Sequence, residues 1–197
     1  REDFRVYGRF ARERFDDFAW ENDKVAFRMY GEALETWERE PLTSSSVDAW
    51  VKKTPKLTVN DWYLVDDYHR DHGEGGDFYS AGKTRGCGGS GLLSEGRLFT
   101  SKNFRRSRVL SRGPIRLVFE LTYDAWDVAG VKVRETKRVT LDAGSHFSRF
   151  ESRYATESGA PLPETFLWAS GTKKEKGADI RIDPVLGLVR AWEKLNR

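Results

Sequence analysis

The chain has 197 residues, of which 38% are hydrophobic and 33% charged, and its 34 basic and 31 acidic side chains give a net charge of +3. Its seven Trp, seven Tyr and twelve Phe exclude a disordered protein, because disordered chains are poor in aromatic residues. The basic residues are scattered among acidic ones, which argues against a nucleic-acid partner. No stretch approaches the roughly 20 apolar residues that a membrane span needs.

The length suits a single mainly β domain over residues 1–197, with enough chain for a real core. We find no internal repeat of fixed period and no low-complexity linker that would divide it. The lone cysteine, Cys87, excludes an intrachain disulfide framework and a multi-cysteine zinc site.

Alternation of apolar and polar residues predicts strands along most of the chain. In chain order the expected strands are 24–30, 98–104, 116–123, 131–141, 147–155 and 165–171. Turn-forming residues at 127–130 and 142–145 separate three long strands, which predicts an antiparallel meander in a β-sandwich, not a βαβ fold. A serine run predicts one short helix at 45–53, and 186–196 fits a strand or a helix.

One segment, 66–91, shows neither the strand nor the helix period and is rich in glycine, so we expect a long loop. It carries two of the three histidines and side chains of nearly every type used in acid–base chemistry. The candidate residues are Tyr68, His69, His72, Glu74, Asp77 and Tyr79. We expect them to transfer protons or bind substrate. The alternatives are a divalent metal held by His69 and His72 with Asp71 or Glu74, although H-x-x-H in a loop is not a defined zinc spacing, or mere loop polarity.

The same loop ends in a glycine-rich stretch, 84–91, that contains Arg85 and Cys87. Glycines let the backbone approach a ligand closely, and Arg85 would suit a carboxylate. The stretch is not a P-loop, because it lacks the Gly-Lys-Ser/Thr ending. For Cys87 a structural thiol is a better interpretation than a nucleophile.

A third group lies near the N-terminus, where Glu13, Asp16 and Asp17 precede Trp20. Paired carboxylates beside an aromatic ring are typical of glycosidases, but a turn leading into the 24–30 strand explains the pattern equally well. Arg9, Trp20 and Lys102 complete the candidate substrate-binding residues.

Five segments of the sequence together resemble the bacterial family called domain of unknown function 4861. They are RFARERFDDFAWENDKVAFRMYGEAL, DAWVKKTPKL, DDYHRDHGEGGDFYSAGKTRGCGG, GPIRLVFELTY and KRVTLDAGSHFSRFES. The likeness runs from about Val6 to Glu193, and family members are usually longer. It implies a galactose-mutarotase-like supersandwich, lacking its last strands here, in a periplasmic or extracellular protein associated with polysaccharide breakdown.

The resemblance also implies an acidic oligosaccharide or polysaccharide as partner and elimination from a uronate as the reaction, either as a dehydratase or as a lyase. In that mechanism Arg85, supported by Arg9 or Lys102, neutralises the carboxylate, since charge develops beside it. His69 or His72 removes the proton, and Tyr68 or Tyr79 protonates the leaving oxygen. We expect no cofactor and no metal. Hydrolysis, sugar epimerisation or mutarotation, and a non-catalytic sugar-binding module remain open alternatives.

Overall fold

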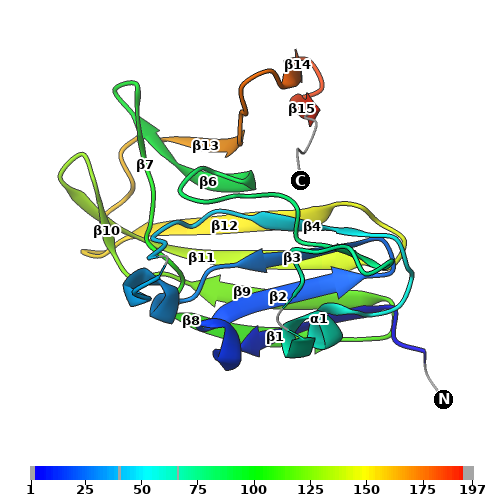
Figure 1. Cartoon of the computed structure of the whole chain (residues 1–197). Helices are drawn as coiled ribbons and strands as arrows, with labels where there is room; N and C mark the ends of the chain where they lie inside the picture. The colour runs from blue at the N-terminus through cyan, green and yellow to red at the C-terminus, as the bar shows by residue number, and fades with distance from the viewer. Residues whose placement is uncertain (1–2, 40, 66, 193–197) are drawn as a thin grey trace.

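The structure is a computed structural model, in which residues 3–39, 41–65 and 67–192 are described. Two antiparallel sheets of five strands each form a sandwich (Figure 1). The first sheet runs in the order β1 (Val6–Ala11), β2 (Asp17–Asn22), β3 (Val25–Met29), β4 (Asp48–Lys52) and β5 (Gly75–Gly76). The second contains β8 (Arg106–Arg112), β9 (Arg116–Thr122), β10 (Trp126–Val128), β11 (Val131–Asp142) and β12 (Ser148–Thr156), with β11 pairing β9, β10 and β12.

Smaller elements lie around this sandwich. A three-stranded sheet has the order β13 (Leu167–Thr172), β6 (Cys87–Ser94) and β7 (Arg97–Phe99), and β14 (Asp179–Asp183) pairs with β15 (Leu188–Trp192) as a hairpin at the top of Figure 1. The helices are α1 (Val59–Val65) and the 3-10 turns η1 (Arg12–Arg14) and η2 (Glu32–Thr36). Neither α1 nor any other helix in the described ranges is long and apolar enough to cross a membrane.

The core lies between the two five-stranded sheets. Alternate residues of β2, Phe18 and Trp20, face alternate residues of β9, Leu117 and Phe119, and all are at most 1% exposed. Phe18 and Phe119 stack with ring centroids 4.1 Å apart. Each such side chain contributes about 1.5–3 kcal/mol when fully buried, so this layer holds the sandwich together.

The outer face of the first sheet is also covered, by α1 and the loop that follows it. Trp50 of β4 packs there with Trp62, Tyr63 and Tyr68. Glu21 of β2 fixes the start of α1, because its carboxylate accepts the backbone N–H groups of residues 58 and 59, each at 2.9 Å, while the buried Lys52 ammonium lies 2.6 Å away. This anchoring places the loop after α1 above β3 and β4.

The structure confirms the all-β antiparallel sandwich and the expected strands at 24–30, 116–123, 131–141, 147–155 and 165–171. The helix expected at 45–53 is wrong: Asp48 and Trp50 face outward in β4, whereas Ala49 packs against the core, which is the period of a strand paired with β3. The strand expected at 98–104 is confirmed only in β7, and α1, β1 and β2 were not anticipated.

The ambiguous segment 186–196 contains β15, and its residues beyond Trp192 lie outside the described ones, as does residue 66 at the start of the expected loop. That loop is otherwise confirmed from 67 to 86, apart from the two-residue β5. Its expected end at 87–91 is wrong, because these residues belong to β6, which pairs with β13. The galactose-mutarotase-like supersandwich and the single-domain organisation stay predictions.

Candidate functional site

A cavity of about 570 Å³ opens on the outer face of the first sheet. Its floor comes from three adjacent strands, through Asp17 of β2, Arg28 of β3 and Asp48 of β4. The loop after α1 supplies one wall and the η2 region the other. The further lining residues used below are Tyr68, His69, Asp77, Tyr79, Arg14, Phe15, Tyr30, Trp37 and Arg39. The volume lies within the range of small-molecule sites in proteins.

The guanidinium of Arg28 is surrounded by three carboxylates at the cavity floor. Its Nε lies 2.9 Å from Oδ2 of Asp48, its Nη2 3.2 Å from Oδ2 of Asp77, and its Nη1 3.6 Å from Oδ2 of Asp17. The three carboxylates are at most 3% exposed and the Arg28 side chain 14%. Nη1 also donates to the hydroxyl of Tyr68 at 3.4 Å. Strand pairing explains the core of this cluster, because Arg28 and Asp48 are register partners on β3 and β4.

Asp17 and Asp48 are both buried beside Arg28, and burial penalises the charged form of a carboxyl group. Desolvation raises the pKa of Asp17 to about 7, against the attraction of Arg28 and the hydrogen bond from the Gly31 N–H. Burial also raises the pKa of Asp48, again opposed by Arg28. A pKa near 7 leaves Asp17 partly protonated at neutral pH, which is typical of general acids.

Asp17 is expected to make the wild-type protein less stable as pH rises. Its folded-state pKa lies above its unfolded value, so its contribution is fully present below about pH 4 and is lost as pH rises through about 7. Urea unfolding from pH 4 to 8 should therefore show wild type losing up to about 1.4 kcal/mol per pH unit relative to Asp17→Asn. Asp142, whose pKa Arg116 lowers, changes its contribution to stability only below about pH 4. Asp142→Asn should therefore run parallel to wild type from pH 4 to 8, and an Asp17→Asn curve that also ran parallel to wild type would contradict the assignment.

His69 lies at the mouth of the cavity, with its side chain 55% exposed. Its Nδ1 is 3.1 Å from the backbone oxygen of Asp77 and 3.6 Å from the Oδ2 of that residue. Because a carbonyl oxygen only accepts, this contact assigns the proton to Nδ1 and leaves the lone pair on Nε2 available to accept a proton. The imidazole packs against Tyr68, with centroids 4.6 Å apart.

Four of the residues predicted from the loop therefore come together in one cavity: Tyr68, His69, Asp77 and Tyr79. Two do not line it. His72 Nε2 is 3.0 Å from Asp67, and Glu74 is 3.8 Å from Lys56, in pairs with side chains 38–76% exposed.

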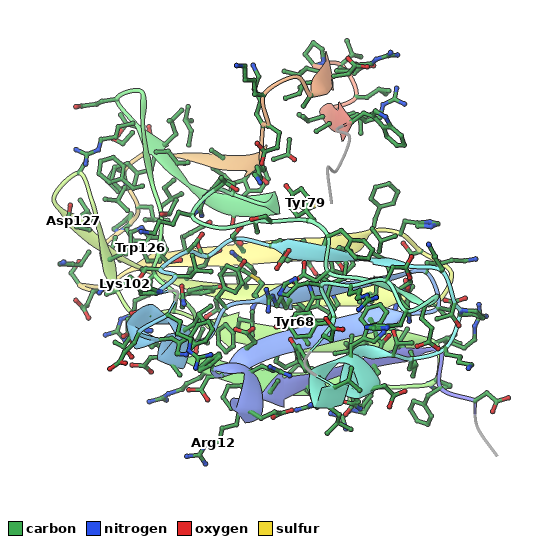
Figure 2. The ribbon with its side chains drawn as sticks, in the orientation of Figure 1. Arg12, Tyr68, Tyr79, Lys102, Trp126 and Asp127 are labelled. Carbon is green, nitrogen blue, oxygen red and sulfur yellow. The ribbon has the colours of Figure 1, made fainter. Side chains whose placement is uncertain are left out.

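The predicted substrate-binding residues outside that loop lie elsewhere. Trp20 is a core residue with an exposed fraction of 0%, so its ring offers no face to a sugar. Arg9 donates to Asn60 at 2.7 Å and pairs with Glu13 beside α1. Lys102 is exposed and lies far from Tyr68 in Figure 2.

Arg85 is also absent from the cavity lining. Its guanidinium donates to the hydroxyls of Ser44 and Ser45 at 3.1 and 3.0 Å. Desolvation by burial lowers its pKa, against the nearby Tyr123 and Glu135. Arg85 thus links the glycine-rich stretch to Ser44 and Ser45. The arginines that line the cavity are Arg14, Arg28 and Arg39.

Arg28 and Asp48 were missed from the sequence. Arg28 alternates with apolar residues in an expected strand, which is the ordinary pattern of a solvated face. The available signal was that Ala26 and Tyr30 share its face, a combination that suits a covered surface better than water. Asp48 was hidden by the incorrect helix. In residues 3–39, 41–65 and 67–192 no group of three or more His, Cys, Asp or Glu side chains is arranged to hold a metal ion.

A family model described as "Domain of unknown function (DUF4861)" matches residues 2–196, essentially the whole chain. The protein belongs to this family. It is also 42% identical over 154 residues to "Uncharacterized protein P7" of Formosa agariphila. That alignment covers 74% of this chain and 39% of the relative, so this member spans well under half of the length of the relative. No solved structure matches this protein.

Proposed function

We propose that this DUF4861 protein acts on uronic-acid-containing oligosaccharides by elimination, within the cavity above β2, β3 and β4. The observation that carries the proposal is the convergence of a histidine with an available Nε2, two tyrosines and a proton-bearing carboxyl group on one cavity of ligand size. Elimination needs a base and a proton donor together, and the cavity supplies both types of group.

An acidic sugar suits the remaining lining residues. Arg14 and Arg39 stand at the cavity together with the stacked rings of Phe15 and Trp37, whose centroids are 4.4 Å apart. Aromatic rings pack on the apolar faces of sugars, and guanidinium groups pair with carboxylates. With the pKa of Asp17 near 7, Arg28 at the floor is opposed by fewer than three full negative charges, which reduces the repulsion of an anionic substrate.

In the proposed reaction, Nε2 of His69 takes the proton from C5 of the uronate. The electron pair of that C–H bond forms the C4=C5 double bond, and the bond from C4 to its oxygen substituent breaks. Tyr68 or Tyr79 gives a proton to the departing oxygen. Loss of a glycosidic oxygen makes the protein a lyase, and loss of a hydroxyl as water makes it a dehydratase.

Mass spectrometry of saturated and unsaturated acidic oligosaccharides incubated with the protein tests the proposal. Cleavage without addition of water, or loss of one water without cleavage, is the expected result. Cleavage with addition of water would replace elimination by hydrolysis, with Asp17 as the acid. Unchanged masses with saturable binding would leave a sugar-binding module, or an epimerase or mutarotase, which NMR of the incubated sugars would distinguish.

Tyr68→Phe refines the same measurement, because it removes only the hydroxyl and keeps the ring stacked on Trp50, 5.2 Å between centroids. If Tyr68 is the proton donor, turnover should fall by about 10²–10⁴-fold with little change in KM. Tyr7→Phe is the matched control, since Tyr7 lies on β1 and does not line the cavity. Full activity in Tyr68→Phe would assign the role to Tyr79.

A further inference from the structure

A second hollow, of about 1210 Å³, lies between the edge of the sandwich and the C-terminal strands. One side is formed by residues 24–25 and 49–52 and by the β11–β12 turn with His146 and Phe147. The other side is formed by β13 and the β14–β15 hairpin, which lie above β4 and β12 in Figure 1. None of the residues that we assign to proton transfer, other than Tyr79, belongs to this groove.

The walls of this groove carry large aromatic side chains that the rest of the fold leaves uncovered. Trp168 is 61% exposed, Phe147 81% and Trp192 80%. Strand alternation accounts for the orientation of Trp168, because Ser170 and Thr172 share its face of β13 and also line the groove, whereas its neighbour Leu167 does not. Exposed aromatic residues gathered on a concave surface mark a binding site more often than a chance arrangement.

The charged groups of the groove are mostly cationic. Lys24, Lys52, Lys173, Arg181 and Arg190 line it, and Asp179 is its one carboxylate among the described residues. Lys52 pairs with the buried Glu21. Lys173 pairs with Glu175, and Arg181 lies 3.1 Å from Asp179. Within the part of the chain that the structure describes, Lys24 and Arg190 form no ion pair, so two cations remain for an anionic ligand.

The groove adjoins the cavity above β2, β3 and β4. Tyr79 lines both hollows, and Figure 2 places it on the side of β13, away from Tyr68. The ammonium of Lys173 lies 5.8 Å from the centroid of the Tyr79 ring and donates to the backbone oxygen of Ser80 at 2.6 Å. Ser80 is itself a lining residue of the cavity. A chain that occupied both hollows would pass over Tyr79 and Lys173.

From aromatic platforms, unpaired cations and continuity with the cavity, we infer that the groove binds the extended part of an anionic oligosaccharide, whose terminal residues reach the cavity. The inference rests on the proposed function for the direction of the chain, but the binding of a long anionic chain in the groove is independent of any turnover. Its consequence is a preference for longer oligosaccharides over mono- and disaccharides.

Isothermal titration calorimetry with oligogalacturonates of increasing length, and with neutral cello-oligosaccharides of equal length, tests the inference on the whole chain. Affinity for the anionic series should rise with length in wild type and weaken with added salt. In Trp168→Ala the longest chain should bind about tenfold more weakly, the size of one lost aromatic contact, whereas a disaccharide should bind as in wild type. Leu167→Ala is the matched control, since Leu167 is 59% exposed on the other face of β13.

The outcomes separate the two proposals. Length-dependent binding that Trp168→Ala removes, without any change in substrate mass, supports the groove and overturns elimination. Turnover with no dependence on length, and with Trp168→Ala equal to wild type, overturns the groove and keeps elimination. Equal affinity for neutral chains would also overturn the anionic assignment. Self-association of the wild type that Trp168→Ala abolishes in sedimentation would show instead that a second copy of this chain fills the groove.

Discussion

Replacing His69 by Gln is expected to lower kcat/KM on an acidic oligosaccharide by about 10²–10⁴-fold, the usual contribution of a positioned general base. Glutamine keeps much of the size of the side chain and a group able to donate to the Asp77 carbonyl, but it has no lone pair basic enough to take a carbon-bound proton. Because the imidazole is 55% exposed at the mouth of the cavity, the substitution should leave the urea midpoint of unfolding unchanged. Initial rates followed by absorbance of the new double bond would measure the loss.

His72→Gln is the matched control, because His72 is three residues away and similarly exposed, yet its Nε2 faces Asp67 and it does not line the cavity. Its activity should stay within about twofold of wild type, because its side chain does not line the cavity. Exposed ion pairs contribute little to folding stability, so the variant should also fold normally. If the two variants lost activity equally, the base would not be His69. If neither lost activity, the acid–base role would pass to the carboxylates of the cavity floor.

Replacing Arg28 by Met is expected to be the most destabilising change in the site, at about 3–5 kcal/mol near pH 8. Methionine fills part of the volume but removes the guanidinium that pairs with Asp17, Asp48 and Asp77. The pKa values of Asp17 and Asp48 should then rise further, so the variant is stabilised by protonation at low pH and loses that stability as pH rises. The deficit relative to wild type in urea unfolding should therefore be smaller at pH 5 than at pH 8.

Arg108→Met serves as the control, since Arg108 is 72% exposed and its pair with Glu120, 2.9 Å apart, lies on the surface of the second sheet. It should cost at most about 1 kcal/mol at either pH. Adding Asp17→Asn to Arg28→Met should recover part of the loss, because it removes one of the uncompensated charges. A loss in Arg28→Met that matched Arg108→Met and did not vary with pH would mean that the three carboxylates are not held together by Arg28.

Local patterns were sufficient wherever a residue's neighbours in sequence set its environment. The alternation in 116–123 and 131–141 predicted β9 and β11, because a strand with one buried face repeats every two residues. The same rule failed for β4. The serines before it resemble a helix cap, and both of its outward residues are buried, Trp50 under α1 and Asp48 at the cavity floor. A strand covered on both faces loses the polar half of its pattern.

The site shows the same division. Glycine, histidine and tyrosine in the segment 66–91 predicted a functional loop from composition alone, and Tyr68, His69, Asp77 and Tyr79 do line one cavity. Which partners they meet depends on strand register, which sets Arg28 beside Asp48, and on the anchoring of α1 by Glu21, which sets the loop above them. These are contacts between residues 20 to 49 positions apart, and one chain carries no signal of such distant pairings. The amino-acid sequence alone thus established the chemical character of the loop. The raised pKa of Asp17, the absence of Arg85 and Trp20 from the cavity, and the second groove follow only from how the sheets and the C-terminal strands pack.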